Sequence, residues 1–293
     1  MEYMEHNERR LLSFLEKYRR PVFFWVSFVA VIVASNMGSV ILYDKYFRTV
    51  DVVSGLTTED DENCSLLGIN LHGELLTYIP EGNSDEMLAN KDVSSSEYIV
   101  HSIQAAEEDL KMKAILVEVD SLGGYPVAGE EIALAIHSAT KPVVAVIRGG
   151  GLSAAYWAVS SADHIFASKN SDIGSIGVTI SYLENVESNK KSGISYNQLS
   201  SGKYKDTGVP DKPLTADEKE LIMRDVMIMH NNFVESIAVY RNMSTDKVSN
   251  LADGSSVLGA QAKELGLIDE IGGIPEATRY LEQKVGTKLD ICW

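Results

Sequence analysis

The sequence predicts an α/β fold built around a parallel β-sheet, and three observations support this prediction. Runs of apolar and β-branched residues alternate with segments of helical periodicity. Two of these runs, residues 114–119 and 142–147, are almost entirely apolar, as in strands that are covered on both faces. A glycine-containing segment and then a helical pattern follow each run, an order that implies parallel strands joined by right-handed crossovers.

The elements that precede the first glycine segment are predicted from short patterns. A strand is expected at residues 66–70, and His72-Gly73 is expected to begin a turn. Apolar residues recur at helical spacing over residues 95–110, and Ser94–Ser96 supply candidates for the N-cap. A first helix is therefore predicted to pack against the first strand.

The central elements alternate around the two glycine segments. The strand at 114–119 is expected to end in a loop at Asp120–Gly124 (DSLGG), and the strand at 142–147 is expected to end at the run Gly149–Gly151. A long helix is predicted over 215–240, because Thr215 and Glu218 have the spacing of a capping box. The other predicted elements are helices at 130–138 and 153–160 and a short strand at 165–167.

Composition excludes several functions. The net charge of −16 argues against a nucleic-acid-binding surface, because such surfaces are basic. Cys64 and Cys292 are the only cysteines, and no Cys/His spacing indicates a metal site. A disulfide between them and two free thiols both remain open. We predict no cofactor and no metal.

One segment departs from the pattern of a soluble protein. Residues 22–43 carry no charged side chain, and at about 1.5 Å per residue they cover a bilayer core of roughly 30 Å. Basic residues cluster before this segment, so we expect a single-pass anchor in the plasma membrane, with a cytoplasmic N-terminus and the remainder outside. A cleaved signal peptide and a buried core helix are the alternatives. The predicted parts are a cytoplasmic segment (1–21), a transmembrane helix (22–43), an acidic stalk (44–63) and one domain (64–293).

Both glycine segments follow buried parallel strands, so they are expected to open at the same edge of the sheet, where ligands bind in such folds. Ser153 lies where a strand gives way to a helix, a geometry that exposes a hydroxyl for attack. The glycines of 121–124 offer N–H donors for an oxyanion. Two alternatives are a glycine turn that only packs a helix on the sheet and a nucleotide site, for which no GxGxxG or GK[ST] motif follows a strand.

A serine nucleophile needs a base. His164, next to Asp163, is one candidate, but it lies at the far end of the helix that Ser153 begins. Lys203 and Lys205 in SSGKYKD are others, since a lysine acts as a base when desolvation keeps its amine neutral. From composition alone, solvated loop lysines are the simpler interpretation.

The chain resembles the bacterial signal peptide peptidase A (protease IV) family in its short, single-domain, membrane-anchored form. The resemblance covers roughly residues 66–280, and the order and spacing of its motifs are far more specific than any one of them. The motifs are DSLGG (120–124), KPVVAVI (141–147), GLSAAYWAVSSADHIFAS (151–168), IGSIGV (173–178), SGKYKDTGVPDKPLTADEKE (201–220) and AQAKELGLIDEIGG (260–273).

This resemblance implies a fold similar to Clp protease and crotonase, with repeated ββα units, and a Ser–Lys dyad. An acyl-CoA enzyme of crotonase type is not favoured, because of the predicted anchor. The roles that the resemblance implies are Ser153 as nucleophile, Lys205 as general base, Gly123 and Ala154 as oxyanion-hole donors, and Ser175 and Gly177 as residues lining the site.

The family also implies the substrates and the assembly. The expected substrates are apolar peptides such as remnant signal peptides, and the expected assembly is a homo-oligomer in which a neighbouring copy can supply the lysine. Some residues depart from the family pattern: Leu122 replaces a proline, Ala154 and Ala155 replace glycines, and Trp157 replaces a tyrosine. These departures bear on the shape of the substrate pocket, and the two alanines favour the alternative of an inactive member that binds peptides or serves as a scaffold.

Overall fold

The structure is a computed structural model that describes residues 64–79 and 93–293. The predicted cytoplasmic segment, transmembrane helix and stalk (1–63) lie outside the described residues. Among the helices of 64–79 and 93–293, none combines the length and the hydropathy that crossing a bilayer requires.

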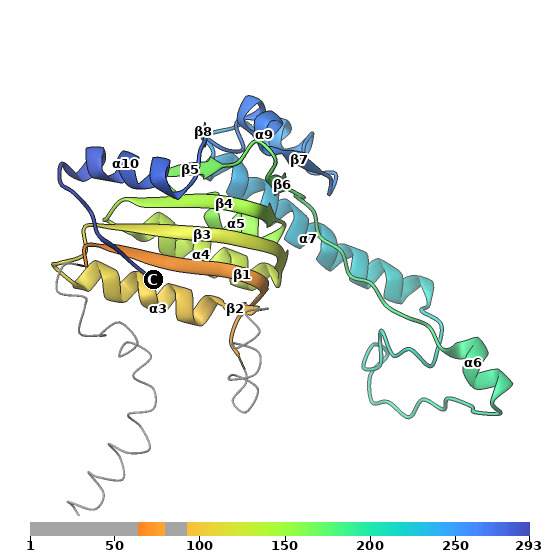
Figure 1. Cartoon of the computed structure of the whole chain (residues 1–293). Helices are drawn as coiled ribbons and strands as arrows, with labels where there is room; N and C mark the ends of the chain where they lie inside the picture. Colours follow the sequence, from red (N-terminus) through yellow and green to blue (C-terminus); the bar gives the residue numbers. More distant parts are fainter. Residues whose placement is uncertain (1–63, 80–92) are drawn as a thin grey trace, which may run out of the picture. The chain divides into compact units, whose positions relative to one another are not determined.

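A mixed β-sheet forms the centre of the domain. Its main strands follow the order β2-β1-β3-β4-β5-β8 and are parallel throughout (Figure 1). Strand β6 pairs in parallel with the last residues of β4, and β7 pairs with β6 in antiparallel orientation. The α/β prediction with parallel strands is therefore confirmed. The strands are β1 (Leu66–Leu76), β2 (Val93–Ser95), β3 (Ala114–Gly124), β4 (Val143–Leu152), β5 (His164–Ala167), β6 (Asp172–Gly174), β7 (Ser256–Leu258), β8 (Glu270–Ile271) and β9 (Ile291–Cys292).

Helices cover both faces of the sheet, which explains the continuous apolar runs. Alternate side chains of a strand point to opposite faces. On one face Ala114 and Leu116 of β3 join a buried cluster with Ala277 and Leu281 of α10. The neighbouring side chains of β3 face the helices α4 and α5, and α3 packs against α4 and β1. The helices are α3 (Ser96–Glu108), α4 (Pro126–Ser138), α5 (Ala154–Val159), α6 (Val186–Lys191), α7 (Ala216–Tyr240), α8 (Thr245–Ser249), α9 (Gly259–Leu265) and α10 (Ile274–Val285).

The glycine segments are not loops, and this part of the sequence prediction was wrong. Strand β3 continues through Gly124, where its register lies opposite Leu75 of β1, and β4 continues to Leu152 by pairing with β6. The turn expected at His72-Gly73 is instead a shift in register within β1. Backbone pairing extends past the apolar runs because glycine has no side chain to obstruct a bulged or closely approaching strand.

Helix α7 packs on the domain mainly through its second half. Phe233 stacks on Trp157 of α5 with ring centroids 4.6 Å apart, and Val234 and Ile237 are buried nearby. In the first half Met223 and Met227 are about half exposed. The connection from β6 to α7 contains α6, and none of residues 178–213 is buried. This connection has no apolar core of its own.

A disulfide joins the beginning of β1 to β9. Cys64 and Cys292 are bonded, with their Cα atoms 5.9 Å apart, and β9 pairs with β1 at Leu66 and Leu67. The question that the sequence left open is thus answered in favour of pairing. The bond closes a loop with a sequence separation of 228.

We expect the change Cys292→Ser to lower the free energy of unfolding by about 2–5 kcal/mol, because a crosslink over a long loop restricts the unfolded chain. Denaturant titration of the domain with and without the substitution measures the effect. The wild type treated with a reductant serves as a control and should lose the same stability. Equal midpoints for the oxidised, reduced and substituted forms would contradict the pairing.

Candidate active site

Ser153 occupies a strained position between β4 and α5. Its φ of 51° and ψ of −127° lie in a region that non-glycine residues rarely adopt and that costs about 1–3 kcal/mol. Two hydrogen bonds hold the backbone there: the Ser153 N–H donates to Gly174 O at 2.8 Å, and Trp157 N–H donates to Ser153 O at 2.9 Å. The residue is half-buried. Such a sharp strand-to-helix turn presents a serine hydroxyl at the edge of a sheet.

Glycine residues allow neighbouring elements to approach Ser153 closely. A Cβ atom on Gly123, at the end of β3, would lie 2.8 Å from Ser153 Cβ, and the φ of Gly123 is +108°. A Cβ atom on Gly129 of α4 would lie 2.5 Å from the carbonyl oxygen of Ala154, the first residue of α5. The end of β3 and the middle of α4 therefore enclose the junction at which Ser153 stands.

We expect the change Gly123→Ala to reduce peptide hydrolysis by about 10²-fold or more. The added methyl group displaces Ser153 or the backbone of β3, and misplacement of a reacting group by about 1 Å costs on this order. The substitution also strains a backbone with positive φ. The measurement is kcat/KM on an unstructured peptide, together with the thermal midpoint.

Gly286 offers a matched control for this variant. It also has a positive φ, +76°, but a Cβ atom there would meet nothing within 4 Å. Gly286→Ala should therefore reproduce the backbone strain and leave kcat/KM unchanged. Equal activities of the Gly123→Ala variant and the wild type would show that the end of β3 does not determine the position of Ser153.

The two predicted oxyanion donors differ in their present partners. The N–H of Gly123 donates to Ser121 Oγ at 3.1 Å, and that hydroxyl in turn donates to Gly73 O at 2.5 Å. The N–H of Ala154 is the first of α5, where no intrahelical acceptor exists. This donor directly follows Ser153 in the chain, whereas the N–H of Gly123 must leave Ser121 Oγ before it can bind an oxyanion.

A cavity of about 470 Å³ opens at Ser153. It brings Ser153 together with Ser175 and Gly177, which were both predicted to line the site. Ser175 has a φ of 50°, and its hydroxyl donates to Gly254 O at 3.0 Å, so its lone pairs remain available to a ligand.

Sequence reasoning missed the two titratable residues of this cavity, His230 of α7 and Asp253. Hydrogen bonds from the hydroxyl and N–H of Ser255 lower the pKa of Asp253, which keeps its carboxylate charged. No sequence signal marks either residue, because only the packing of α7 and of the loop before β7 brings them to the cavity. In the described part of the chain, no cluster of three or more His, Cys, Asp or Glu side chains is arranged to hold a metal ion.

Lys205 is not among the residues that line this cavity. It is exposed, and it lies in a stretch that we call the lysine segment, residues 196–212. The hydrogen bonds of this segment all connect residues within 185–218. Within a single chain, the structure therefore does not bring the predicted base together with Ser153.

The lysine segment contains three lysines that differ in their ionic partners. Lys203 pairs with Asp217, and Lys212 pairs with Glu218 at 2.5 Å. Hydrogen bonds to these carboxylates raise the pKa of both lysines, which keeps them protonated. Within the described residues, Lys205 forms no ion pair. A general base must be neutral, so Lys205 is the most suitable of the three.

His164, the alternative base, lies away from the site. It begins β5 opposite Val144, at the amino ends of the strands, whereas Ser153 follows the carboxyl end of β4. Its ring stacks on Tyr280 with centroids 4.3 Å apart, and its Nε2 lies 3.6 Å from Glu270. A packing role accounts for these contacts.

A family model and several relatives connect this chain to known peptidases. The model of peptidase family S49 matches residues 135–288. A putative protease of Methanocaldococcus jannaschii is 36% identical over 64% of this chain and 60% of its own length. A putative signal peptide peptidase SppA of Enterococcus faecium is 30% identical over 80% and 76%, respectively.

Two further similarities cover the chains unequally. Protease 4 of Haemophilus influenzae is 30% identical over 76% of this chain but only 35% of its own length, so the chain spans about a third of that relative. Among solved structures, a ClpP1 mutant from Listeria monocytogenes has a TM-score of 0.46 and 16% identity, covering 71% of this chain and 92% of its own.

Proposed function

Because this chain belongs to peptidase family S49, a family of serine-type peptidases, we propose that it is a membrane-anchored serine endopeptidase with a Ser–Lys dyad. The observation that carries the proposal is the strained conformation of Ser153 at the junction of β4 and α5, against the glycines of β3. Backbone strain is maintained at functional sites, where the surrounding structure enforces it.

The proposed mechanism has a specific sequence of steps. Ser153 Oγ attacks the peptide carbonyl, and the neutral amine of Lys205 accepts its proton. The N–H of Ala154 stabilises the oxyanion, and the N–H of Gly123 joins it after leaving Ser121 Oγ. Lys205 then protonates the departing amine, and a water molecule hydrolyses the acyl-enzyme with Lys205 as base again.

Lys205 acts from a neighbouring copy of the chain in this proposal. Two features support a homo-oligomer: no residue of 178–213 is buried in one chain, and this connection exposes several large apolar side chains. Leu183 and Leu199 are 84% and 100% exposed. Burial of these side chains at a contact would also desolvate Lys205 and so favour its neutral form.

The disulfide between Cys64 and Cys292 supports a location outside the cytoplasm, because disulfides persist in oxidising compartments. We therefore propose that residues 22–43 anchor the protein in the membrane. The N-terminus then lies in the cytoplasm, and the peptidase domain lies outside. The substrates that we propose are apolar peptides such as remnant signal peptides, in line with the name of the Enterococcus relative.

An acylating serine probe tests the function directly. We expect a single adduct on Ser153 in the assembled full-length protein and none on the other serines. Absence of an adduct on Ser153 would favour the alternative of an inactive peptide-binding scaffold. The assay does not depend on knowing the substrate, since the probe reports the nucleophile itself.

A further inference from the structure

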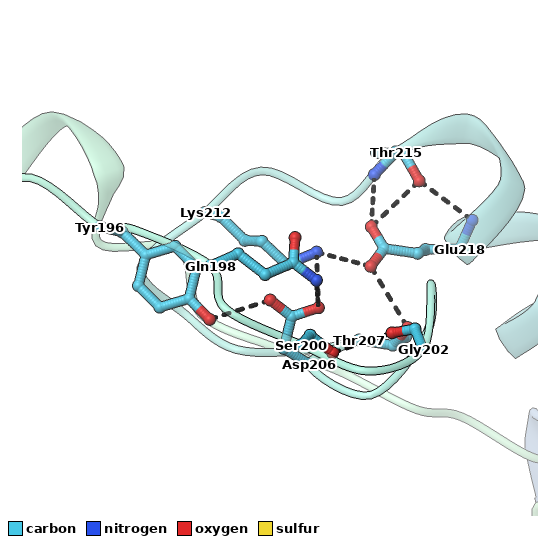
Figure 2. A network of polar contacts seen from close by, with 9 residues as sticks. All are labelled: Tyr196, Gln198, Ser200, Gly202, Asp206, Thr207, Lys212, Thr215 and Glu218. Atoms are coloured by element: carbon cyan, nitrogen blue, oxygen red, sulfur yellow. Dashed lines mark hydrogen bonds and ion pairs between the residues drawn. The ribbon is translucent and has the colours of Figure 1, made fainter.

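Two charged side chains of the lysine segment and one of the first turn of α7 are withdrawn from water, although most of the residues around them are exposed. The side chains of Asp206, Lys212 and Glu218 are 12%, 16% and 3% exposed. Lys212 Nζ lies 2.5 Å from Glu218 Oε1 and 3.5 Å from Asp206 Oδ1, so one ammonium group bridges two carboxylates (Figure 2). Charges at this depth persist only when they are paired.

Each carboxylate is fixed by further donors. Asp206 accepts hydrogen bonds from the hydroxyl of Tyr196 at 2.9 Å and from Gln198 Nε2 at 2.7 Å. Glu218 accepts from the N–H of Thr215 at 2.9 Å and from the hydroxyl of Thr207 at 3.2 Å (Figure 2). The cluster therefore ties three parts of the chain together: residues 196–198, the turn at 202–207 and the first turn of α7.

Lys205 lies within the part of the backbone that this cluster holds. It directly precedes Asp206, and the next residue, Thr207, donates a hydrogen bond to Glu218. Because none of residues 178–213 is buried, apolar packing within one chain does not fix the path of the segment. Two sets of contacts thus determine where the backbone of Lys205 lies relative to α7: the polar cluster, and the ion pair of Lys203 with Asp217, whose side chains are both exposed.

We infer that Lys212 is a positioning residue, which holds the backbone of Lys205 in place by bridging Asp206 to Glu218. The inference rests on the proposed role of Lys205 as the base. Lys212 touches no substrate, and it acts through Asp206. A base is effective only when it is held in place, since a displacement of about 1 Å costs on the order of 10²-fold in rate.

The ion pair between Lys212 and Glu218 keeps both of these groups charged near neutral pH, because hydrogen bonding between them raises the pKa of Lys212 and lowers that of Glu218. The hydrogen bond from Lys212, with others from Thr215, lowers the pKa of Glu218 from 4.5 to about 2. A depressed carboxyl pKa contributes stability that is fully present above the unfolded value of 4.5 and is lost as the pH falls toward 2. The positioning of Lys205 therefore does not titrate near neutral pH.

The test compares Lys212→Met, Lys212→Arg and wild type in the full-length assembly. Methionine retains the length of the side chain but removes the bridge, so we expect kcat to fall about 10–100-fold while KM stays within about twofold. Amide hydrogen exchange should become faster in residues 203–209 and stay unchanged in β3 and β4. Arginine keeps the charge and should restore most of kcat. Lys284→Met is the matched control, because Lys284 is exposed on α10 and lies outside the 178–213 connection.

Three outcomes would overturn the inference: an unchanged kcat in Lys212→Met, unchanged exchange at 203–209, or a loss of activity that sedimentation traces to a dissociated assembly. Lys205→Ala separates this failure from failure of the proposed function. If Lys205→Ala is inactive and Lys212→Met is fully active, only the positioning role fails. If Lys205→Ala is fully active, the proposed base is wrong.

Discussion

The change Ser153→Ala is expected to abolish peptide hydrolysis, with a loss of at least about 10⁴-fold in kcat. Removal of a nucleophile that works together with a base costs as much as removal of the whole catalytic group. The fold should survive, because the contacts that hold residue 153 are made by its backbone N–H and C=O. The measurement is cleavage of an unstructured apolar peptide by the full-length protein, with circular dichroism to confirm folding.

Ser138→Ala is the matched control, since Ser138 is exposed at the end of α4 and does not line the cavity. It should have the activity of the wild type. Residual hydrolysis by Ser153→Ala at more than a few per cent would remove Ser153 from the mechanism. Ser175, the other serine that lines the cavity, would then be the candidate nucleophile.

The sheet and its helices could be predicted from sequence because burial on both faces leaves a clear signal. The strands at 114–119 and 142–147 and the helix capped by Thr215 and Glu218 lie where their patterns indicate, and the capping box forms in full. Strand ends were predicted poorly. Gly149–Gly151 indicated a loop, yet these residues remain paired in β4, because pairing with β6 depends on a strand that is distant in sequence.

The candidate site was predictable where it depends on local chain geometry. Ser153 at a strand–helix junction follows from the order of the patterns, and the approach of Gly123 follows from parallel pairing of neighbouring strands. The presence of His230 and Asp253 in the cavity depends on tertiary packing alone. The position of Lys205 relative to Ser153 was beyond prediction for a different reason: its segment has no core within one chain.

Replacement of Lys205 by alanine is expected to lower kcat by about 10²–10⁴-fold, the usual contribution of a general base. If the lysine comes from a neighbouring copy, two inactive variants should restore one another. A site is then complete when its serine belongs to a Lys205→Ala chain and its lysine to a Ser153→Ala chain. Random mixing of equal amounts of the two variants gives an intact serine and an intact lysine in about a quarter of the sites.

The decisive experiment co-expresses the two variants with different tags and purifies assemblies that carry both. We expect about a quarter of the wild-type activity per chain, against almost none for either variant alone. In such assemblies no single chain holds both Ser153 and Lys205. If verified mixed assemblies are inactive, the serine and the lysine of one site must therefore come from the same chain. The variant His230→Ala completes the test, because His230 of α7 lines the same cavity as Ser153. If His230→Ala is inactive while Lys205→Ala is fully active, the general base is His230 and not Lys205.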